Sequence, residues 1–218
     1  MHTNTRTPGR SGFSLVELVI VVLVLAALAG LLLSVLARRR EEARRIRCRN
    51  NLNQLAKGMA TYLNPHGPGR FYVCPLGRTR NPNTYNGAEW LAALYWTGDV
   101  TDPSIYICPS TTDTNRDGLD LGSYFQAATF GSQTVSYAGM HYNSDSNEAG
   151  AIRDDYPPNK PMASDDTQGD INHGTADNGG MHILFFDSHV EFRTNTELDL
   201  TRAVGDRSPD ALLDELAN

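Results

Sequence analysis

The sequence predicts an α+β protein in which a long N-terminal α-helix packs on an antiparallel β-sheet head. Residues 13–37 are apolar apart from Glu17, and residues 38–64 continue with apolar side chains at helical spacing. Farther along, residues 182–193 hold two strand-like runs separated by a turn. We therefore expect four parts: a polar leader at 1–12, a transmembrane helix at 13–37, its amphipathic continuation at 38–64, and a globular β-rich head at 65–218.

The apolar segment 13–37 is long enough to cross a membrane, which takes roughly 20 residues. A secretory signal peptide has a shorter apolar region followed by a small-residue cleavage site, whereas this segment runs into the sequence RRREEARR. A helix of a soluble protein is seldom apolar on all its faces over such a length. A membrane helix is therefore favoured. A plain anchor in which Glu17 has no role remains an alternative.

The start of this segment carries a more specific pattern. Residues 12–18 read Gly-Phe-Ser-Leu-Val-Glu-Leu, after a short leader that contains Arg6 and Arg10. This pattern resembles the N-terminus of type IV pilins and type II secretion pseudopilins. The resemblance implies that prepilin peptidase cleaves after Gly12, that the new N-terminal residue Phe13 is methylated, and that Glu17 acts in assembly.

A charge argument supports a role for Glu17. The free α-amine of a cleaved chain at Phe13 is positive near neutral pH, and an isolated charge inside a membrane is costly. Pairing of Glu17 in one subunit with the Phe13 amine of a neighbour offsets part of that cost. We therefore expect this chain to assemble with other pilin or pseudopilin subunits in the inner membrane.

The charges outside the span give two further expectations. The net charge of −6 arises from an acidic head, which predicts no binding to nucleic acid. The resemblance implies a single-pass protein of the inner membrane, with its head in the periplasm or outside the cell. The positive-inside rule alone favours the opposite orientation, because a run of arginines follows the span: Arg38, Arg39, Arg40, Arg44, Arg45, Arg47 and Arg49.

The next elements along the chain are shorter. In the amphipathic continuation, one helical face is expected to carry Ile46, Leu52, Leu55, Met59 and Tyr62 or Leu63. Prolines and glycines end this helix just after residue 63. We then expect a strand at 71–74, a helix at 88–96 that is stopped by a glycine, and a strand at 104–108.

The second half of the head is harder to interpret, because residues 111–180 are rich in Asn, Asp, Gly, Ser and Thr. Weak strands are expected at 124–130 and 134–142, with a long loop at 145–180. Residues 183–186 are apolar on both faces and predict a central strand. After a turn at Asp187 and Ser188, alternation predicts a half-exposed strand, and residues 209–216 predict a short helix.

The strand–turn–strand run brings a second resemblance. Its sequence, GGMHILFFDSHVEF, is similar to the C-terminal element of a large family of bacterial prepilin-like proteins. That family shows a histidine, nine residues, and then Asp-Gly-His. Here Asp187, Ser188 and His189 occupy the last three places, Asp177 stands where the leading histidine would be, and His173 comes four residues before it.

A run of oxygen-bearing side chains suggests a calcium loop. Asp113, Asn115, Asp117 and Asp120 alternate around a turn glycine, as in the first part of a calcium-binding loop. The glutamate that closes an EF-hand is absent, and an Asx-rich turn is the simpler interpretation. The resemblance to pseudopilins, which carry calcium in this half of the chain, supports calcium as the alternative. No cofactor is otherwise required.

The chain has three cysteines, Cys48, Cys74 and Cys108. Cys74 and Cys108 lie in similar Tyr-Val-Cys-Pro and Tyr-Ile-Cys-Pro runs, so a disulfide between them is plausible outside the cytoplasm, with three free thiols as the alternative. A zinc site is disfavoured, since no Cys-x-x-Cys pair exists. Five polar residues cluster near the C-terminus: His173, Asp177, His182, Asp187 and His189. Solvated surface histidines are the favoured interpretation, with a metal or acid–base site as the alternative.

These observations predict a pilin-like structural subunit of a type IV pilus or a type II secretion pseudopilus. The alternative is a membrane-tethered extracytoplasmic protein that uses its acidic head to bind a ligand. We find no nucleophile elbow, phosphate loop or Cys/His signature in the sequence, so an enzyme is not expected.

Overall fold

The computed structural model describes residues 14–63, 87–122, 133–140, 156–165, 173–174, 179–198 and 216–217. By its internal contacts the chain divides into Met1–Arg40 and Glu41–Asn218. The strands expected at 71–74 and 124–130 lie outside the described residues.

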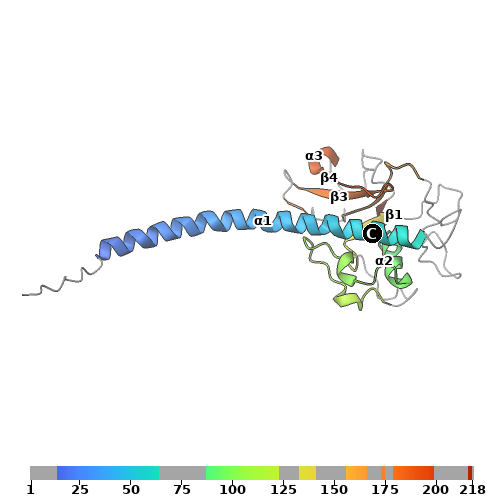
Figure 1. Ribbon diagram of the computed structural model, residues 1–218, viewed down its shortest axis with the longest axis horizontal. Helices are drawn as coiled ribbons and strands as arrows, with labels where there is room; N and C mark the ends of the chain where they lie inside the picture. The colour runs from blue at the N-terminus through green and yellow to red at the C-terminus, as the bar shows by residue number, and fades with distance from the viewer. Residues whose placement is uncertain are drawn as a thin grey trace, which may run out of the picture. The chain divides into compact units, whose positions relative to one another are not determined.

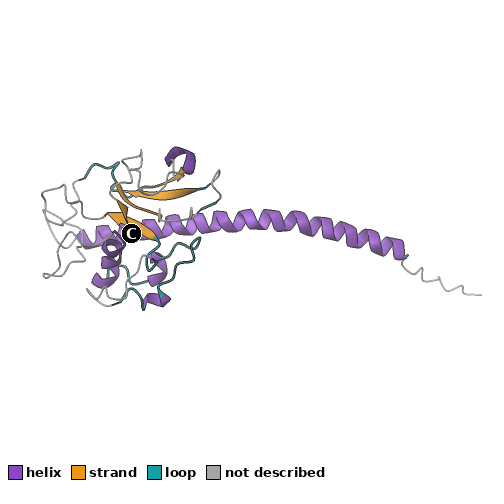
Figure 2. Ribbon diagram, turned by 180° about the vertical axis from the view of Figure 1, so that it is seen from behind, coloured by secondary structure: helices purple, strands orange, loops and turns teal. Residues whose placement is uncertain are grey.

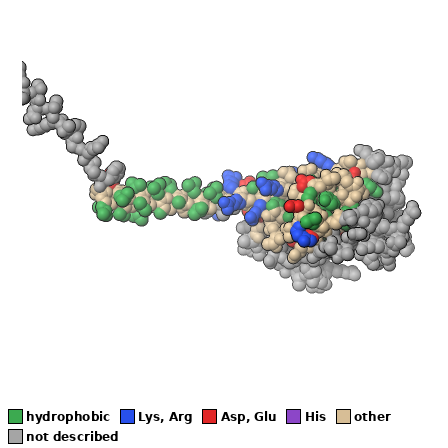
Figure 3. Space-filling view, turned by 90° about the horizontal axis from the view of Figure 1, so that it is seen from below, with side chains coloured by type: hydrophobic (Ala, Val, Ile, Leu, Met, Phe, Trp, Pro, Cys, Tyr) green, Lys and Arg blue, Asp and Glu red, His purple; other side chains and the backbone are tan. Residues whose placement is uncertain are grey.

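The predicted long helix is confirmed as α1, Leu15–Leu63. It has the length and composition to cross a membrane once, near its N-terminal end. The large apolar side chains that the structure describes between Leu15 and Leu36 are 46% to 78% exposed. Figure 3 shows them around the first part of α1, with Lys and Arg side chains gathered where the apolar stretch ends. This stretch therefore presents its apolar surface outward, as a membrane helix does.

The second half of α1 supplies one wall of the core of the head. Cys48, Leu52, Leu55, Met59 and Leu63 are buried at spacings of three and four residues, which places them on one face. The prediction is confirmed at Leu52, Leu55, Met59 and Leu63. The prediction for Ile46 is wrong, because its side chain is 55% exposed and Cys48 is the buried residue at this end of the face.

A five-stranded antiparallel sheet forms the opposite wall, with strand order β4-β3-β2-β1-β5. Figure 1 and Figure 2 show the second half of α1 between this sheet and the segment that carries α2. The strands are β1 (Tyr137–Met140), β2 (Pro161–Asp165), β3 (Gly180–Phe185), β4 (Val190–Thr194) and β5 (Leu216–Ala217).

The β3–β4 hairpin follows the prediction. The turn holds Asp187 and Ser188, with Ser188 at φ 69°, and also Phe186, because β3 ends at Phe185. Ile183 pairs with Glu191 across the hairpin. β3 is buried along its whole length, while β4 is half-buried, as its alternating sequence predicts. The long loop expected at 145–180 is wrong at β2, which is a buried strand between β1 and β3.

Helix α2, Gly87–Thr97, confirms the predicted helix, and Gly98 follows it at φ 83°. The strand predicted at 104–108 is wrong. A 3-10 helix, η3 (Pro103–Tyr106), begins there because Asp102 caps it, with its carboxylate 2.9 Å from the amide nitrogen of Ser104.

Two more short helices are present among the described residues, η4 (Arg116–Gly118) and α3 (Asn195–Leu198). The helix predicted at 209–216 is wrong at Leu216, which pairs with Met140 in the sheet. The rest of that range lies outside the described residues.

The buried face of α1 gives a first testable expectation. Leu55→Ala should lower the free energy of unfolding of the head by about 2–5 kcal/mol, because it opens a cavity in a fully buried position. Lys57→Ala, at an exposed position of the same helix, should change it by less than about 0.5 kcal/mol. Thermal unfolding of the two variants in detergent checks this, and equal losses would contradict the assignment of the buried face.

Candidate functional site

The N-terminal site residues lie at the start of α1. Glu17 is exposed in the first turn of the helix, where the positive end of the helix dipole favours a carboxylate. Gly12 and Phe13, the predicted cleavage and methylation residues, lie outside the described residues.

A second candidate site lies inside the head. We call it the buried cluster, and it consists of Cys48, Cys108, Asp165 and His173, all with no exposed surface. One atom from each side chain (two sulfurs, a carboxylate oxygen and a ring nitrogen) lies within 4.8 Å of the other three. The four residues come from α1, the segment after η3, the end of β2, and a bridge that pairs with Gly180.

The contacts inside the buried cluster are close. Nε2 of His173 lies 3.6 Å from Sγ of Cys108 and 3.2 Å from Oδ2 of Asp165. Sγ of Cys48 lies 2.6 Å from Oδ1 of Asp165. One ring nitrogen of His173 therefore faces a thiol and a carboxylate together, and the same carboxylate contacts the second thiol.

A surrounding layer of polar groups orients these four side chains. His182 holds Oδ2 of Asp165 with its backbone amide at 2.7 Å and with Nδ1 at 3.1 Å. Nδ1 of His173, on the far side of its ring, lies 3.2 Å from Oε1 of Glu41. The hydroxyl of Tyr137 lies 3.4 Å from Sγ of Cys48 and accepts a hydrogen bond from Asn51.

Phe192 and Arg45 lie against this layer. The ring of Phe192 is 5.0 Å from that of His182 and 6.5 Å from that of His173, measured between centroids. The guanidinium carbon of Arg45 lies 4.8 Å from the centroid of Phe192. Arg45 also donates a hydrogen bond to the carbonyl oxygen of His173 at 3.5 Å.

These contacts shift the pKa values of the buried cluster. Burial raises the pKa of Cys48 well above its usual range. The hydrogen bond from Cys48 lowers the pKa of Cys108 to about 7, although burial opposes this. Burial disfavours the charged forms of His173 and Asp165, but hydrogen bonds outweigh it. The hydrogen bonds of His173 to Asp165 and Cys108 raise the pKa of His173 to about 10. The hydrogen bonds that Asp165 accepts from His173 and His182 lower the pKa of Asp165 below its usual range. These pKa shifts favour the imidazolium form of His173 beside the carboxylate form of Asp165.

The interpretation of the histidines as surface groups is partly wrong. His173 and His182 are buried, whereas His189 is exposed beside Asp187 in the turn. His182 is buried because β3 is covered on both faces. The apolar pattern of β3 pointed to this, whereas the sequence marked His173 only as one of the polar residues clustered near the C-terminus.

Of the two cysteines in the predicted disulfide, the structure describes only Cys108. Cys108 is a free buried thiol in the structure, and its neighbours are Cys48 and His173. Cys74 lies outside the described residues, so the Cys74–Cys108 disulfide stays a prediction.

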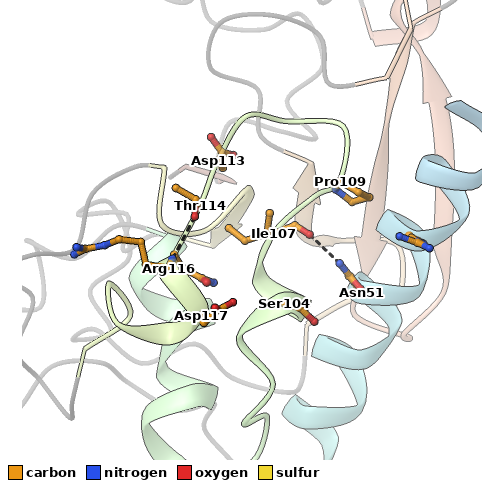
Figure 4. Close-up of a pocket in the computed structure, with 10 residues that line it drawn as sticks. Asn51, Ser104, Ile107, Pro109, Asp113, Thr114, Arg116 and Asp117 are labelled. Atoms are coloured by element: carbon orange, nitrogen blue, oxygen red, sulfur yellow. Dashed lines mark hydrogen bonds between the residues drawn. The ribbon is translucent and has the colours of Figure 1, made fainter. Parts of the chain in front are cut away.

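The predicted calcium loop borders a groove of about 610 Å³ in the head. Asp113, Asn115 and Asp117 line it, across from Asn51 on α1 (Figure 4). Figure 4 shows the carboxylates of Asp113 and Asp117 well separated.

The other two residues of the predicted calcium loop already have partners in the structure. Asp120 pairs with Arg116. The side chain of Asn115 is engaged in its own turn, where it accepts from the Gly118 amide and donates to the carbonyl oxygen of Pro103. Calcium binding would therefore require Asp120 to exchange its guanidinium partner for the ion.

Calcium binding at this loop stays a prediction with a direct test. Adding Ca²⁺ to chelator-treated protein should raise its melting temperature, because an ion that binds only the folded state stabilises it. Asp117→Ala should remove the increase, while Asp187→Ala, outside the loop, should keep it. A melting temperature that Ca²⁺ leaves unchanged would support the Asx-rich turn instead.

The buried carboxylate gives a further expectation. Asp165→Ala should lower the free energy of unfolding by about 3–5 kcal/mol, because it strands buried donors on His173 and His182. Asp187→Ala also removes an aspartate that contacts a histidine, but this pair is exposed, so its loss should be much smaller. Chemical denaturation of both variants measures the difference, and similar losses would show that burial of Asp165 is not decisive.

Comparison with known proteins identifies the N-terminal segment. A family model described as the prokaryotic N-terminal methylation motif matches residues 8–33, which include Gly12, Phe13 and Glu17. No curated protein and no solved structure gives a significant match to the chain. The resemblance of the C-terminal hairpin to a prepilin-like family therefore stays a prediction. The chain carries a prepilin-type methylation motif, of the kind that prepilin peptidase processes, at the start of an apolar helix suited to anchor a single-pass membrane protein.

Proposed function

We propose that this protein is a structural subunit that is cleaved after Gly12, methylated at Phe13, and assembled into a type IV pilus or a type II secretion pseudopilus. The observation that carries the proposal is the match of residues 8–33 to the methylation motif. Its role is to pack and to anchor, and no catalytic step is assigned to it.

The exposed apolar surface of α1 supports assembly. Side chains such as Leu18, Leu25 and Leu32 are at least 60% exposed, so they are available to lipid before assembly and to neighbouring helices afterwards. Lipid and helix surfaces are similarly apolar, and burial alone gives little preference between them. A polar pair between Glu17 and the amine of a neighbouring Phe13 supplies that preference, because it compensates two charges that are costly in lipid.

We place the head on the extracytoplasmic side, as the processing route implies. In this orientation the arginines that follow the apolar stretch lie near the outer surface of the membrane. Arginine side chains at such a position extend toward the headgroups and keep their guanidinium groups solvated.

The groove beside η4 favours a second candidate function, a tethered ligand-binding protein. Its volume of about 610 Å³ is in the range of small-molecule sites. Side chains of both charges line it, including Arg47, Arg116 and Asp117. A protein of this second kind would remain monomeric in the membrane and would retain ligand through its head.

Processing and assembly can be tested separately. Mass spectrometry of the mature wild-type chain should find methylated Phe13 at its N-terminus, and Gly12→Val should leave the leader attached. Glu17→Gln should be cleaved normally but should lose most of its incorporation into filaments, because the carboxylate that pairs with the amine is gone. Glu42→Gln, beyond the apolar stretch of the same helix, is the matched control and should assemble normally.

Several outcomes would contradict the proposal. A mature chain that begins at Met1, or beyond residue 37, would rule out prepilin processing. Normal incorporation of Glu17→Gln would rule out the pairing role. A correctly processed chain that stays monomeric and retains a small molecule would favour the second candidate function.

A further inference from the structure

We propose that the buried cluster is a structural zinc site, in which Cys48, Cys108, His173 and Asp165 bind one Zn²⁺. The inference is independent of the assembly role, because all four residues lie in the Glu41–Asn218 unit. It rests on the identity of the donor atoms, their spacing, and the groups that orient them.

The donor atoms suit zinc. Two thiolates, one imidazole nitrogen and one carboxylate oxygen form a four-ligand set of the kind that Zn²⁺ takes in tetrahedral sites. Calcium and magnesium prefer oxygen ligands throughout, so the sulfurs of Cys48 and Cys108 argue against them. All four positions come from protein and none is exposed, which is typical of a structural site rather than a catalytic one.

The spacing fits a tetrahedron. With zinc–ligand bonds of about 2.3 Å to sulfur and 2.0–2.1 Å to nitrogen or oxygen, tetrahedral neighbours lie about 3.6 Å apart for sulfur and nitrogen and about 3.4 Å apart for nitrogen and oxygen. Sγ of Cys108 and Nε2 of His173 are 3.6 Å apart. Nε2 of His173 and Oδ2 of Asp165 are 3.2 Å apart. Sγ of Cys48 is 2.6 Å from Oδ1 of Asp165, closer than tetrahedral sulfur and oxygen neighbours at about 3.6 Å, so zinc binding requires these two ligands to move apart.

The surrounding layer matches what metal ligands need. A zinc-bound histidine usually donates its other ring N–H to a carboxylate or carbonyl, which fixes its tautomer. Nε2 of His173 faces the buried cluster while Nδ1 faces Glu41 at 3.2 Å, which is this arrangement. The carboxylate of Asp165 is likewise held by the backbone amide and the ring of His182.

The negative charge of the zinc-loaded site is partly offset by a neighbouring arginine. Two thiolates and a carboxylate exceed the charge of Zn²⁺ by one, and Glu41 adds another negative charge nearby. Arg45 lies against this face, with Nε 4.0 Å from Oε1 of Glu41 and Nη2 3.5 Å from the carbonyl oxygen of His173. A guanidinium at this place offsets one of these two excess negative charges.

Two other roles for these residues compete with zinc. A cysteine nucleophile paired with His173 would need access to a substrate, but Cys108 has no exposed surface. A disulfide between Cys48 and Cys108 would use the same two sulfurs, which lie within 4.8 Å of each other. A disulfide would leave Asp165 and His173 without a metal, so mass and metal content separate these two outcomes.

Metal content of the full chain, purified in detergent, provides the main test. Elemental analysis should find about one zinc per chain after reduction and loading with Zn²⁺. Co²⁺ in its place should give the absorption bands of a tetrahedral ion with two thiolate ligands. Failure to retain zinc through gel filtration would overturn the proposal. So would a cobalt spectrum without thiolate bands, or a Cys48–Cys108 disulfide in the protein as isolated.

Cysteine variants test the ligand set. Cys48→Ser and Cys108→Ser should each lose the bound metal, while Cys74→Ser, the third cysteine, should retain it. Retention of one zinc per chain by both cluster variants would overturn the proposal.

A substitution outside the ligand set tests the site even if the cysteine variants misfold. Glu41→Gln leaves the four ligands in place and removes the carboxylate that faces His173. The same carboxylate also contacts Arg44, Arg45 and Ser110, but its side chain is 29% exposed, so the head should fold. It should weaken Zn²⁺ binding about 10- to 100-fold in a competition assay with a chromogenic chelator. Glu42→Gln, the next residue on α1, should bind as the wild type does, and equal affinities for the two variants would contradict the proposed role of His173.

Discussion

A carboxylate with no solvent exposure constrains the head of this protein. Asp165 ends β2 inside the core, where a charge is stable only if other groups compensate for it. The compensating groups come from β3, from the bridge at His173 and from α1, through His182, His173 and Cys48. Satisfying this one side chain therefore fixes how the sheet, the helix and the intervening segments meet.

The core and the buried cluster are parts of one surface on α1. Cys48 belongs to the same stripe as Leu52, Leu55 and Met59, so the helix presents a polar contact and an apolar face together. Gly58, on this half of the helix, permits close packing, since a Cβ at that position would lie 2.3 Å from a methyl carbon of Val100. A rotation of α1 by one residue would break the core and the polar contacts at once, which ties the register of the helix to the fold of the head.

The sequence predicted the elements whose patterns are long or locally marked. α1 was found because its apolar stretch and stripe run far along the chain, and the β3–β4 hairpin because a turn separates two clear runs. The strand expected at 104–108 failed because Asp102 and Pro103 form a helix start, and this capping outweighed the apolar run after it. β2 was missed since it is short and lies in a polar region. The buried cluster was missed because its two cysteines lie far along the chain from Asp165 and His173: Cys108 is separated from His173 by 65 residues, and Cys48 from Asp165 by 117. No local spacing can reveal such a site.

β4 lies at the end of the strand order, and its outer edge matters where many copies of the protein meet. Its outer edge has no neighbouring strand among those the structure describes, so its backbone groups could pair with another sheet. Phe192 turns toward the buried histidines, while Glu191 and Arg193 alternate with it and hold each other at 2.8 Å. In the proposed filament many identical edges would meet at high local concentration, and charged side chains on such an edge oppose sheet-to-sheet aggregation. β4 thus combines a cover for the interior with protection against its own copies.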